Sequence, residues 1–199
     1  MRFPLSLQFK ILAFAPQITV RDADGSELLY VHQKLFKLKE QIKVYRDSGK
    51  GEIAYQIAAD RVLDFSARYA FTEASGASVG SVKRSGMKSL WRAHYEVADA
   101  AGQAVLTIGE DNPAVKLLDG LLGEIPVIGM ASGYFLHPRY TVAEHATSHP
   151  VLRVSKRRSF LEAKFTVTAE PAAAGLSPEV ETAAVLAILT MALLERSRG

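Results

Sequence analysis

The sequence contains no cysteine among its 199 residues. This absence excludes disulfide bonds, thiolate metal sites, cysteine nucleophiles and palmitoyl anchors, and it suits a reducing cytoplasm. Proline-rich and serine-rich runs are few, and the chain is 48% hydrophobic and 23% charged, a composition that argues against a largely disordered protein. A chain of this length can bury a sizeable core, and we expect residues 1–199 to form a single domain.

Signatures of known catalytic and metal sites are missing as well. The segment Gly129 to Gly133 has the wrong spacing for a nucleophile elbow, and there is no phosphate-binding loop or dinucleotide fingerprint. The stretch Asp22 to Gly25 lacks the other ligands of an EF-hand loop and is typical of a hairpin turn. Glu144, His145 and His149 have metal-ligating side chains, but their neighbours indicate a hairpin loop. We therefore expect no catalytic residues, no metal and no cofactor.

What the sequence does contain is a well-marked helix from Pro178 to Arg196. Ser177 is a good N-cap, proline fits the first turn, and acidic residues follow it. From Ala183 to Leu194 every residue except Thr190 is apolar, so the helix has no polar face and must be enclosed. These 12 residues span roughly 18 Å, well short of the roughly 30 Å hydrocarbon core of a bilayer. Enclosure by protein is therefore favoured over enclosure by lipid.

The rest of the chain is rich in strand patterns. Turn-type glycines recur at nearly equal spacing, at Gly25, Gly51, Gly76 and Gly102, and each is flanked by two runs of β-forming residues. These runs predict four hairpins and eight strands. Alternation of apolar and polar residues predicts further strands within Leu7 to Phe14, Tyr140 to Glu144, Val151 to Val154 and Phe160 to Thr168.

About twelve antiparallel strands are enough to surround the final helix, because a barrel of about eleven strands has room for a helix of about 10 Å diameter. A short helix is also predicted from Asn112 to Leu122, where an asparagine and a proline form a cap and a first turn. We therefore predict a mainly β fold, an antiparallel barrel of about twelve strands that encloses the hydrophobic helix 178–196.

The hairpins, the segment Val82 to Tyr95, the run Asn112 to Tyr134 and the apolar final helix together resemble the LURP-one-related family. The resemblance implies a twelve-stranded barrel around a helix, similar in fold to the tubby C-terminal domain and the phospholipid scramblases. Tubby domains bind phosphoinositides and scramblases work at membranes, so lipid binding is implied only as a class of function. The chain departs from the scramblases because it has no cysteine cluster and because Glu170 is the only acidic residue in the linker before the helix. These departures speak against calcium-driven scrambling.

Positive charge is concentrated in three stretches, Gln33 to Arg46, Lys83 to Arg92 and Arg153 to Arg158, each with a net charge of +4. The whole chain carries only +3, so the remainder is strongly acidic. This asymmetry favours an anionic partner, although the same residues also suit solvated strand faces. We predict that the second and third stretches bind an anionic phospholipid surface or a phosphorylated head group. We place the third stretch, Arg153 to Arg158, at a connection between strands. The predicted binding residues are Lys83, Arg84, Lys88, Arg92, Arg153, Lys156, Arg157 and Arg158.

Other functions stay open at this point. The sheet exterior or the segment Asn112 to Tyr134 suits protein contacts in an interaction or scaffold domain without lipid activity, and scramblase-like membrane association is a further alternative. Nucleic-acid phosphates would contact the same basic residues, but nucleic acid is the less favoured partner. We expect a non-enzymatic, cytoplasmic protein, held peripherally at a membrane if it binds lipid, whose oligomeric state the sequence does not determine.

Overall fold

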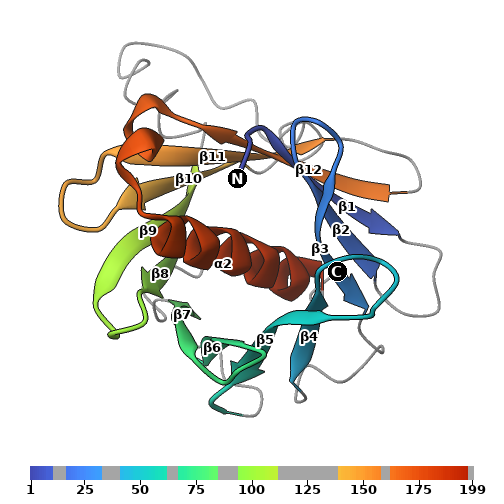
Figure 1. Cartoon of the computed structure of the whole chain (residues 1–199). Coiled ribbons are helices and arrows are strands. Elements are labelled where there is room, and N and C mark those ends of the chain that lie inside the picture. Colours follow the sequence, from blue (N-terminus) through green and yellow to red (C-terminus); the bar gives the residue numbers. More distant parts are fainter. Residues whose placement is uncertain are drawn as a thin grey trace, which may run out of the picture.

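The computed structural model describes residues 1–10, 17–32, 41–61, 67–84, 94–111, 139–157 and 162–196. Within these ranges the chain forms twelve strands, a short 3₁₀ helix η3 (Pro171–Gly175) and a long helix α2 (Pro178–Arg196) (Figure 1). The strands are β1 (Leu5–Lys10), β2 (Gln17–Arg21), β3 (Glu27–His32), β4 (Ile42–Tyr45), β5 (Ile53–Ala59), β6 (Arg68–Glu73), β7 (Ser78–Arg84), β8 (His94–Ala98), β9 (Ala104–Asp111), β10 (Arg139–Glu144), β11 (Pro150–Arg157) and β12 (Glu162–Ala169). The helix predicted from Asn112 to Leu122 lies outside the described residues.

The strands form a closed antiparallel barrel in which each strand pairs with its neighbours in sequence, and β1 closes the ring against β12. The pairing register follows the alternation of apolar residues, because every second side chain of a strand points to the same face. Leu7 of β1, for example, lies opposite Val20 of β2 and Phe165 of β12, and all three side chains are buried. The prediction of a twelve-stranded barrel is confirmed.

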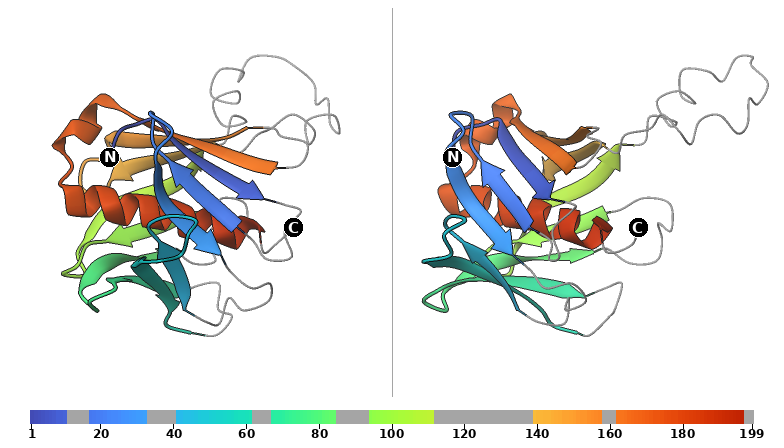
Figure 2. Two further views of the ribbon diagram at one scale, coloured as in Figure 1. Left: turned by 45° about the vertical axis from the view of Figure 1, so that its right-hand side comes forward. Right: turned by 90° about the vertical axis from the view of Figure 1, so that its right-hand side faces the viewer.

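Helix α2 lies inside the barrel, with every residue from Ala183 to Leu193 buried (Figures 1 and 2). Thr190 is the one polar residue of this stretch, and its hydroxyl donates a hydrogen bond to the carbonyl of Leu186 at 2.8 Å, so it is buried with a partner. The backbone N–H of Val180 donates to the Ser177 hydroxyl at 3.3 Å, which confirms the predicted N-cap. In the part of the chain that the structure describes, no helix is both long and apolar enough to cross a membrane.

The helix packs most closely against β7, followed by β8 and β6. Gly80 of β7 faces the helix, where an added Cβ atom would meet the Cβ of Ala183 at 3.5 Å, an ordinary contact. The same Cβ would lie only 2.3 Å from the carbonyl oxygen of Ala98 in β8, so it is the neighbouring strand that requires glycine here. Across the barrel, β1 and β12 carry large side chains instead. The rings of Phe9 and Phe165 lie there with their centroids 5.5 Å apart.

The two ends of the barrel differ in construction (Figure 2). At one end, the turn end, short turns join β2 to β3, β4 to β5, β6 to β7, β8 to β9 and β10 to β11. Helix α2 begins at this end, where Glu181 pairs with the N-terminal ammonium group at 2.6 Å. At the opposite end, the helix-exit end, the odd-numbered strands finish, the even-numbered strands begin, and α2 reaches Arg196.

The turns largely follow the predicted glycine spacing. Gly25, Gly76 and Gly102 all have positive φ angles, between 81° and 89°, which suit glycine. At the second hairpin the residue with a positive φ is Lys50, at 58°, so the prediction that Gly51 makes this turn is wrong by one position. The backbone N–H of Lys50 donates to the Asp47 carbonyl at 3.2 Å, which closes the turn one residue earlier.

Candidate functional site

Acidic residues dominate the turn end of the barrel. Several of them are there for a local structural reason, because an aspartate at the start of a turn accepts backbone N–H groups. The Asp22 carboxylate accepts the N–H groups of Asp24 and Ser26 at 3.0 and 2.9 Å, and Asp99 accepts that of Gln103 at 2.9 Å. The acidic residues of this end are Asp22, Asp24, Glu27, Asp47, Glu52, Glu73, Asp99, Glu144, Glu170, Glu179 and Glu181.

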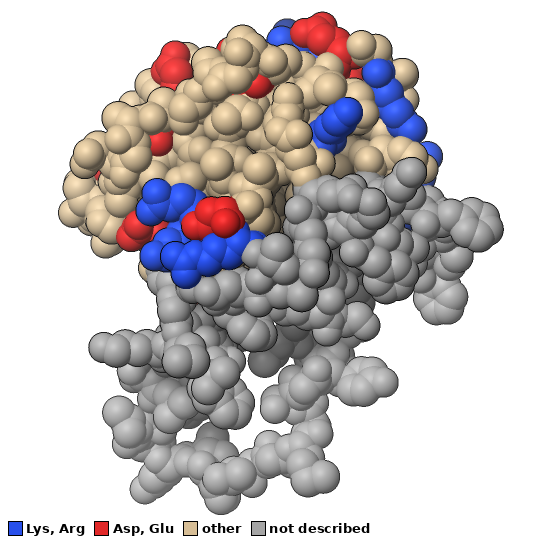
Figure 3. Space-filling view, turned by 90° about the horizontal axis from the view of Figure 1, so that it is seen from below, with Lys and Arg blue, Asp and Glu red and all other residues tan. Residues whose placement is uncertain are grey.

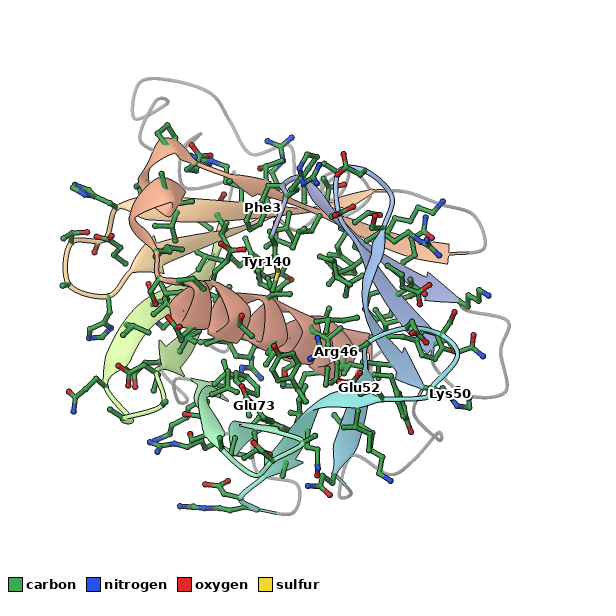
Figure 4. All side chains as sticks on the ribbon, in the orientation of Figure 1. Phe3, Arg46, Lys50, Glu52, Glu73 and Tyr140 are labelled. Atoms are coloured by element: carbon green, nitrogen blue, oxygen red, sulfur yellow. The ribbon has the colours of Figure 1, made fainter. Side chains whose placement is uncertain are left out.

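The arginines of the turn end are neutralised by these carboxylates. Arg2 pairs with Asp24, and Arg21 pairs with Glu27 at 3.4 Å. Arg46 pairs with Glu52 at 2.7 Å across the β4–β5 turn, and this hydrogen bond raises the pKa of the guanidinium group further (Figure 4). The turn end therefore presents a net negative charge, and these three arginines already have carboxylate partners.

The helix-exit end has the opposite character. Among the residues that the structure describes, seven cations at this end form no ion pair: Lys10, Lys43, Arg68, Lys83, Arg84, Arg139 and Lys156. Arg84 is half-buried and the other six are exposed. Figure 3, which views the barrel from the side of β5, β6 and β7, shows Lys and Arg side chains gathered beside the grey atoms with some Asp and Glu side chains among them, and few charges across the middle of the face.

Two nearby carboxylates at the helix-exit end are occupied by other groups. Asp111 accepts the hydroxyl of Thr141 at 2.9 Å, and Asp60 accepts the backbone N–H of Arg68, also at 2.9 Å. Acidic residues are therefore present at this end, but these two do not neutralise the cations around them. The result is a surface on which seven described cations form no ion pair, which we call the basic face and define by those cations.

The second predicted cluster lies at the basic face. Lys83 and Arg84 are the last two residues of β7, and the alternation of the strand places Arg84 on the inner side of the barrel with Val82, and Lys83 on the outer side. Arg84 lies opposite Tyr95 in the register of β7 and β8. Lys88 and Arg92, the other predicted residues of this cluster, lie outside the described residues.

The third cluster is divided. The prediction that it lies at a strand connection is wrong, because β11 extends to Arg157 through its pairing with β12. Arg153, in the middle of the strand, pairs with Glu170 and lies 3.9 Å from Asp111, so it is compensated. Lys156 lies near the strand end, with its ammonium group 5.8 Å from the centre of the Phe165 ring. Arg158 lies outside the described residues.

Four members of the basic face are absent from the predicted set, namely Lys10, Lys43, Arg68 and Arg139. Lys43 belongs to the first basic stretch, Gln33 to Arg46, and the other three lie outside the three stretches, yet each of the four lies at the beginning or end of a strand. In an up-and-down barrel the end of an odd-numbered strand and the beginning of an even-numbered strand share one end. Numbering the predicted strands along the sequence, and collecting the cations at the ends of odd-numbered strands and the beginnings of even-numbered strands, would have placed all seven cations together.

The other candidate motifs form ordinary turns. The hydrogen bonds of Asp22 and the positive φ of Gly25 confirm the predicted hairpin turn. Glu144 lies in the β10–β11 turn, where its N–H donates to the carbonyl of His149 at 3.0 Å and its carboxylate accepts the hydroxyl of Thr147. Among the described residues, no three His, Cys, Asp or Glu side chains are grouped as they would be to hold a metal ion.

The comparisons with known proteins identify a family but no individual relative. No curated protein and no solved structure matches the chain. The LURP-one-related family, however, matches it over residues 27–190, from β3 into the middle of α2, which is more than half of its length. The chain therefore belongs to the LURP-one-related family.

Proposed function

We propose that this protein is a non-enzymatic binding domain that attaches to an anionic phospholipid surface, or to a phosphorylated head group within one, through its basic face. The observation that carries the proposal is the gathering, among the described residues, of seven cations without ion pairs at one end of the barrel. The family match and the barrel filled by its own helix are consistent with a domain that binds rather than catalyses.

Charge compensation is the physical basis of the proposal. An exposed ion pair gains little from a further charged partner, whereas an unpaired Lys or Arg near an anionic membrane contributes about 1 kcal/mol to binding. Lys83, Arg84 and Lys156 belong to this unpaired set, and Arg157 ends β11 at the same end of the barrel. Arg153 is compensated and contributes less. We keep Lys88, Arg92 and Arg158 in the proposed site on the strength of the sequence alone.

Co-sedimentation with vesicles tests the proposal. Neutral phosphatidylcholine vesicles are compared with vesicles that also contain phosphatidylserine, each at low and high salt. We expect binding to the anionic vesicles only, and we expect salt to weaken it, because exposed charges are screened. Binding to neutral vesicles of equal strength would contradict the proposal. If neither vesicle binds, the protein-interaction or scaffold role becomes the better hypothesis.

A pair of variants separates the basic face from general charge effects. The double variant Lys83→Gln, Lys156→Gln removes two cations from the basic face and should weaken binding by about 2 kcal/mol, roughly 30-fold. Arg46→Gln removes a cation at the turn end, where Glu52 already compensates it, and should change binding less than about twofold. Equal effects of the two changes would show that the end of the barrel does not matter.

A further inference from the structure

Two cations of the basic face lie directly opposite each other. Arg68, the first residue of β6, is paired in register with Lys83 of β7, and both side chains are exposed. Directly opposed residues of an antiparallel pair have Cβ atoms roughly 5 Å apart, and like charges in this position are destabilising. The fold therefore keeps an unfavourable pair where a neutral residue in place of Arg68 would remove the repulsion.

Among the described residues, no acidic neighbour forms an ion pair with either cation. Asp60 is the last carboxylate before β6 in the part of the chain that the structure describes, but one oxygen accepts the backbone N–H of Arg68 at 2.9 Å and the other faces Arg61 at 4.0 Å. Glu96 of β8 lies opposite Lys83 on its other side, yet the two form no ion pair. Both cations are left without a counter-charge in direct contact.

The other unpaired cations have different neighbours. Lys43 lies opposite Gln56, Arg84 opposite Tyr95, and Lys156 opposite Phe165. Lys10 and Arg139 each have an acidic residue opposite them, as Lys83 has on its β8 side, but neither is paired in register with a second cation. Arg157 does lie opposite Lys164, but Lys164 is not without an interaction partner. Within the described part of the basic face, Arg68 and Lys83 are thus distinguished as two opposed cations that both lack an ion pair.

We infer that Arg68 and Lys83 together hold one phosphomonoester group on the outer face of β6 and β7. An anion between them would turn their repulsion into two attractions, with the Arg fork donating to two phosphate oxygens and the Lys ammonium donating to a third. A phosphomonoester carries close to two negative charges at neutral pH, which matches two cations better than the single charge of a phosphodiester. The inference rests on the proposed function and deepens it by naming the chemical group recognised.

Vesicles of two kinds, mixed to equal surface charge, test this choice of ligand. Phosphatidic acid exposes a phosphomonoester, whereas phosphatidylglycerol carries only a phosphodiester. The variants Arg68→Gln and Lys83→Gln should each weaken binding to phosphatidic acid about tenfold or more, since each removes hydrogen bonds to a charged group. On phosphatidylglycerol each should cost about fivefold, the general contribution of one cation.

Lys43→Gln is the matched control, because it removes one unpaired cation from the same end of the barrel with a neutral residue opposite it. It should cost about fivefold on both lipids. If Arg68→Gln and Lys43→Gln weaken binding to phosphatidic acid equally, the inference is overturned. If wild-type protein binds the two lipids equally, the inference is likewise overturned, while the proposed attachment to an anionic surface stands.

A soluble probe distinguishes a lipid from a free phosphate ester. Glycerol 3-phosphate is titrated into the wild-type protein, and backbone amide shifts are followed by NMR. Shifts in β6 and β7 that disappear in Arg68→Gln and persist in Lys43→Gln would support the site. If these shifts occur but wild-type protein binds no vesicle, the phosphate site is supported with a soluble ester as its source, and the proposed membrane attachment fails.

The same substitutions that should weaken phosphate binding should stabilise the ligand-free protein, so its melting temperature is a second, independent measurement. Because repulsion is removed, Arg68→Gln should raise the melting temperature at low salt, and added salt should shrink the gain. Lys83→Gln should raise it less, because this change also removes the attraction to Glu96 opposite it. Lys43→Gln should leave the melting temperature unchanged. A lower melting temperature for both pair variants would indicate that these side chains stabilise the barrel and would overturn the inference.

Discussion

Gly80→Ala is the substitution whose effect the structure defines most closely. The new Cβ would lie 2.3 Å from the carbonyl oxygen of Ala98 and 3.4 Å from its carbonyl carbon. The obstructing atoms belong to the backbone of β8, so no side-chain rotation can relieve the contact. In addition, Gly80 has a φ of 148°, a conformation that residues with a side chain rarely adopt.

The expected loss of stability follows from these two effects. Overpacking in a filled core costs about 1–3 kcal/mol, and an unfavourable backbone conformation costs about 1–3 kcal/mol. Alanine also reduces the freedom of the unfolded chain, which offsets about 0.4–1 kcal/mol. We expect Gly80→Ala to lower the free energy of unfolding by about 3 kcal/mol, a large part of the about 5–15 kcal/mol typical of a folded domain.

Urea denaturation followed by far-UV circular dichroism measures this loss. With an m-value of about 2–3 kcal/mol per molar urea, the midpoint should fall by about 1 M. Gly109→Ala is the matched control in β9, because its Cβ would meet only the His94 ring at 3.7 Å, an ordinary contact. This control should leave the midpoint unchanged or raise it slightly.

Two results would refute the reasoning. If Gly80→Ala unfolds within about 0.5 kcal/mol of the wild type, the backbone of Ala98 does not lie as close to position 80 as the structure indicates. If Gly109→Ala loses as much stability as Gly80→Ala, any glycine in these strands is sensitive, and the close contact with Ala98 is not the cause.

Three further predictions concern the helix and the barrel wall. Leu186→Asp should prevent folding, since it buries an unpaired charge at a position with no exposed surface, and a soluble variant with the wild-type melting temperature would contradict the enclosed helix. Ser177→Ala should cost about 1 kcal/mol in urea denaturation because the N–H of Val180 loses its cap, and an unchanged midpoint would show that the cap contributes nothing. Burial and then the Glu27 carboxylate raise the pKa of Tyr30 above its usual 10.0, because both disfavour the charged phenolate in the folded protein. The neutral Tyr30 phenol therefore contributes its full stabilisation below about pH 10, and this stabilisation is lost as the pH rises through the raised pKa. Tyr30→Phe should therefore reduce the loss of melting temperature between pH 9 and pH 11, and an identical alkaline profile in wild type and variant would count against this contribution.

Helix α2 and the number of strands were predictable from the sequence because local and global signals agree there. The helix has a cap, a first-turn proline and an uninterrupted apolar stretch, and its bounds in the structure are Pro178 and Arg196, as predicted. The strands were found from alternation, but most extend beyond the predicted bounds. β11 is the clearest case, since it continues through its basic residues to Arg157 by pairing with β12. Pairing with a neighbouring strand overrides the local preference of a charged run for a loop.

The candidate site was predictable only in part. The clusters identified Lys83, Arg84 and Lys156, but sequence clustering could not separate Arg153, whose charge is compensated by Glu170. That contact joins β11 to the residue that follows β12, and it depends on how far each strand extends. Arg68 was missed for a similar reason, since its partner Lys83 is determined by the register of β6 and β7.

The pairing of β1 with β12 also constrains how the protein can be made. The strand that closes the barrel and the helix that fills it both follow the other eleven strands in the chain. During synthesis on the ribosome, β1 therefore cannot pair with β12 until β12 has been made. The apolar inner faces of the earlier strands also remain uncovered until α2 has been made. Contacts between such distant parts of a chain form slowly, and exposed strand edges and apolar faces promote aggregation in the meantime. Unfinished chains of this protein should therefore depend on chaperones until the final helix has left the ribosome.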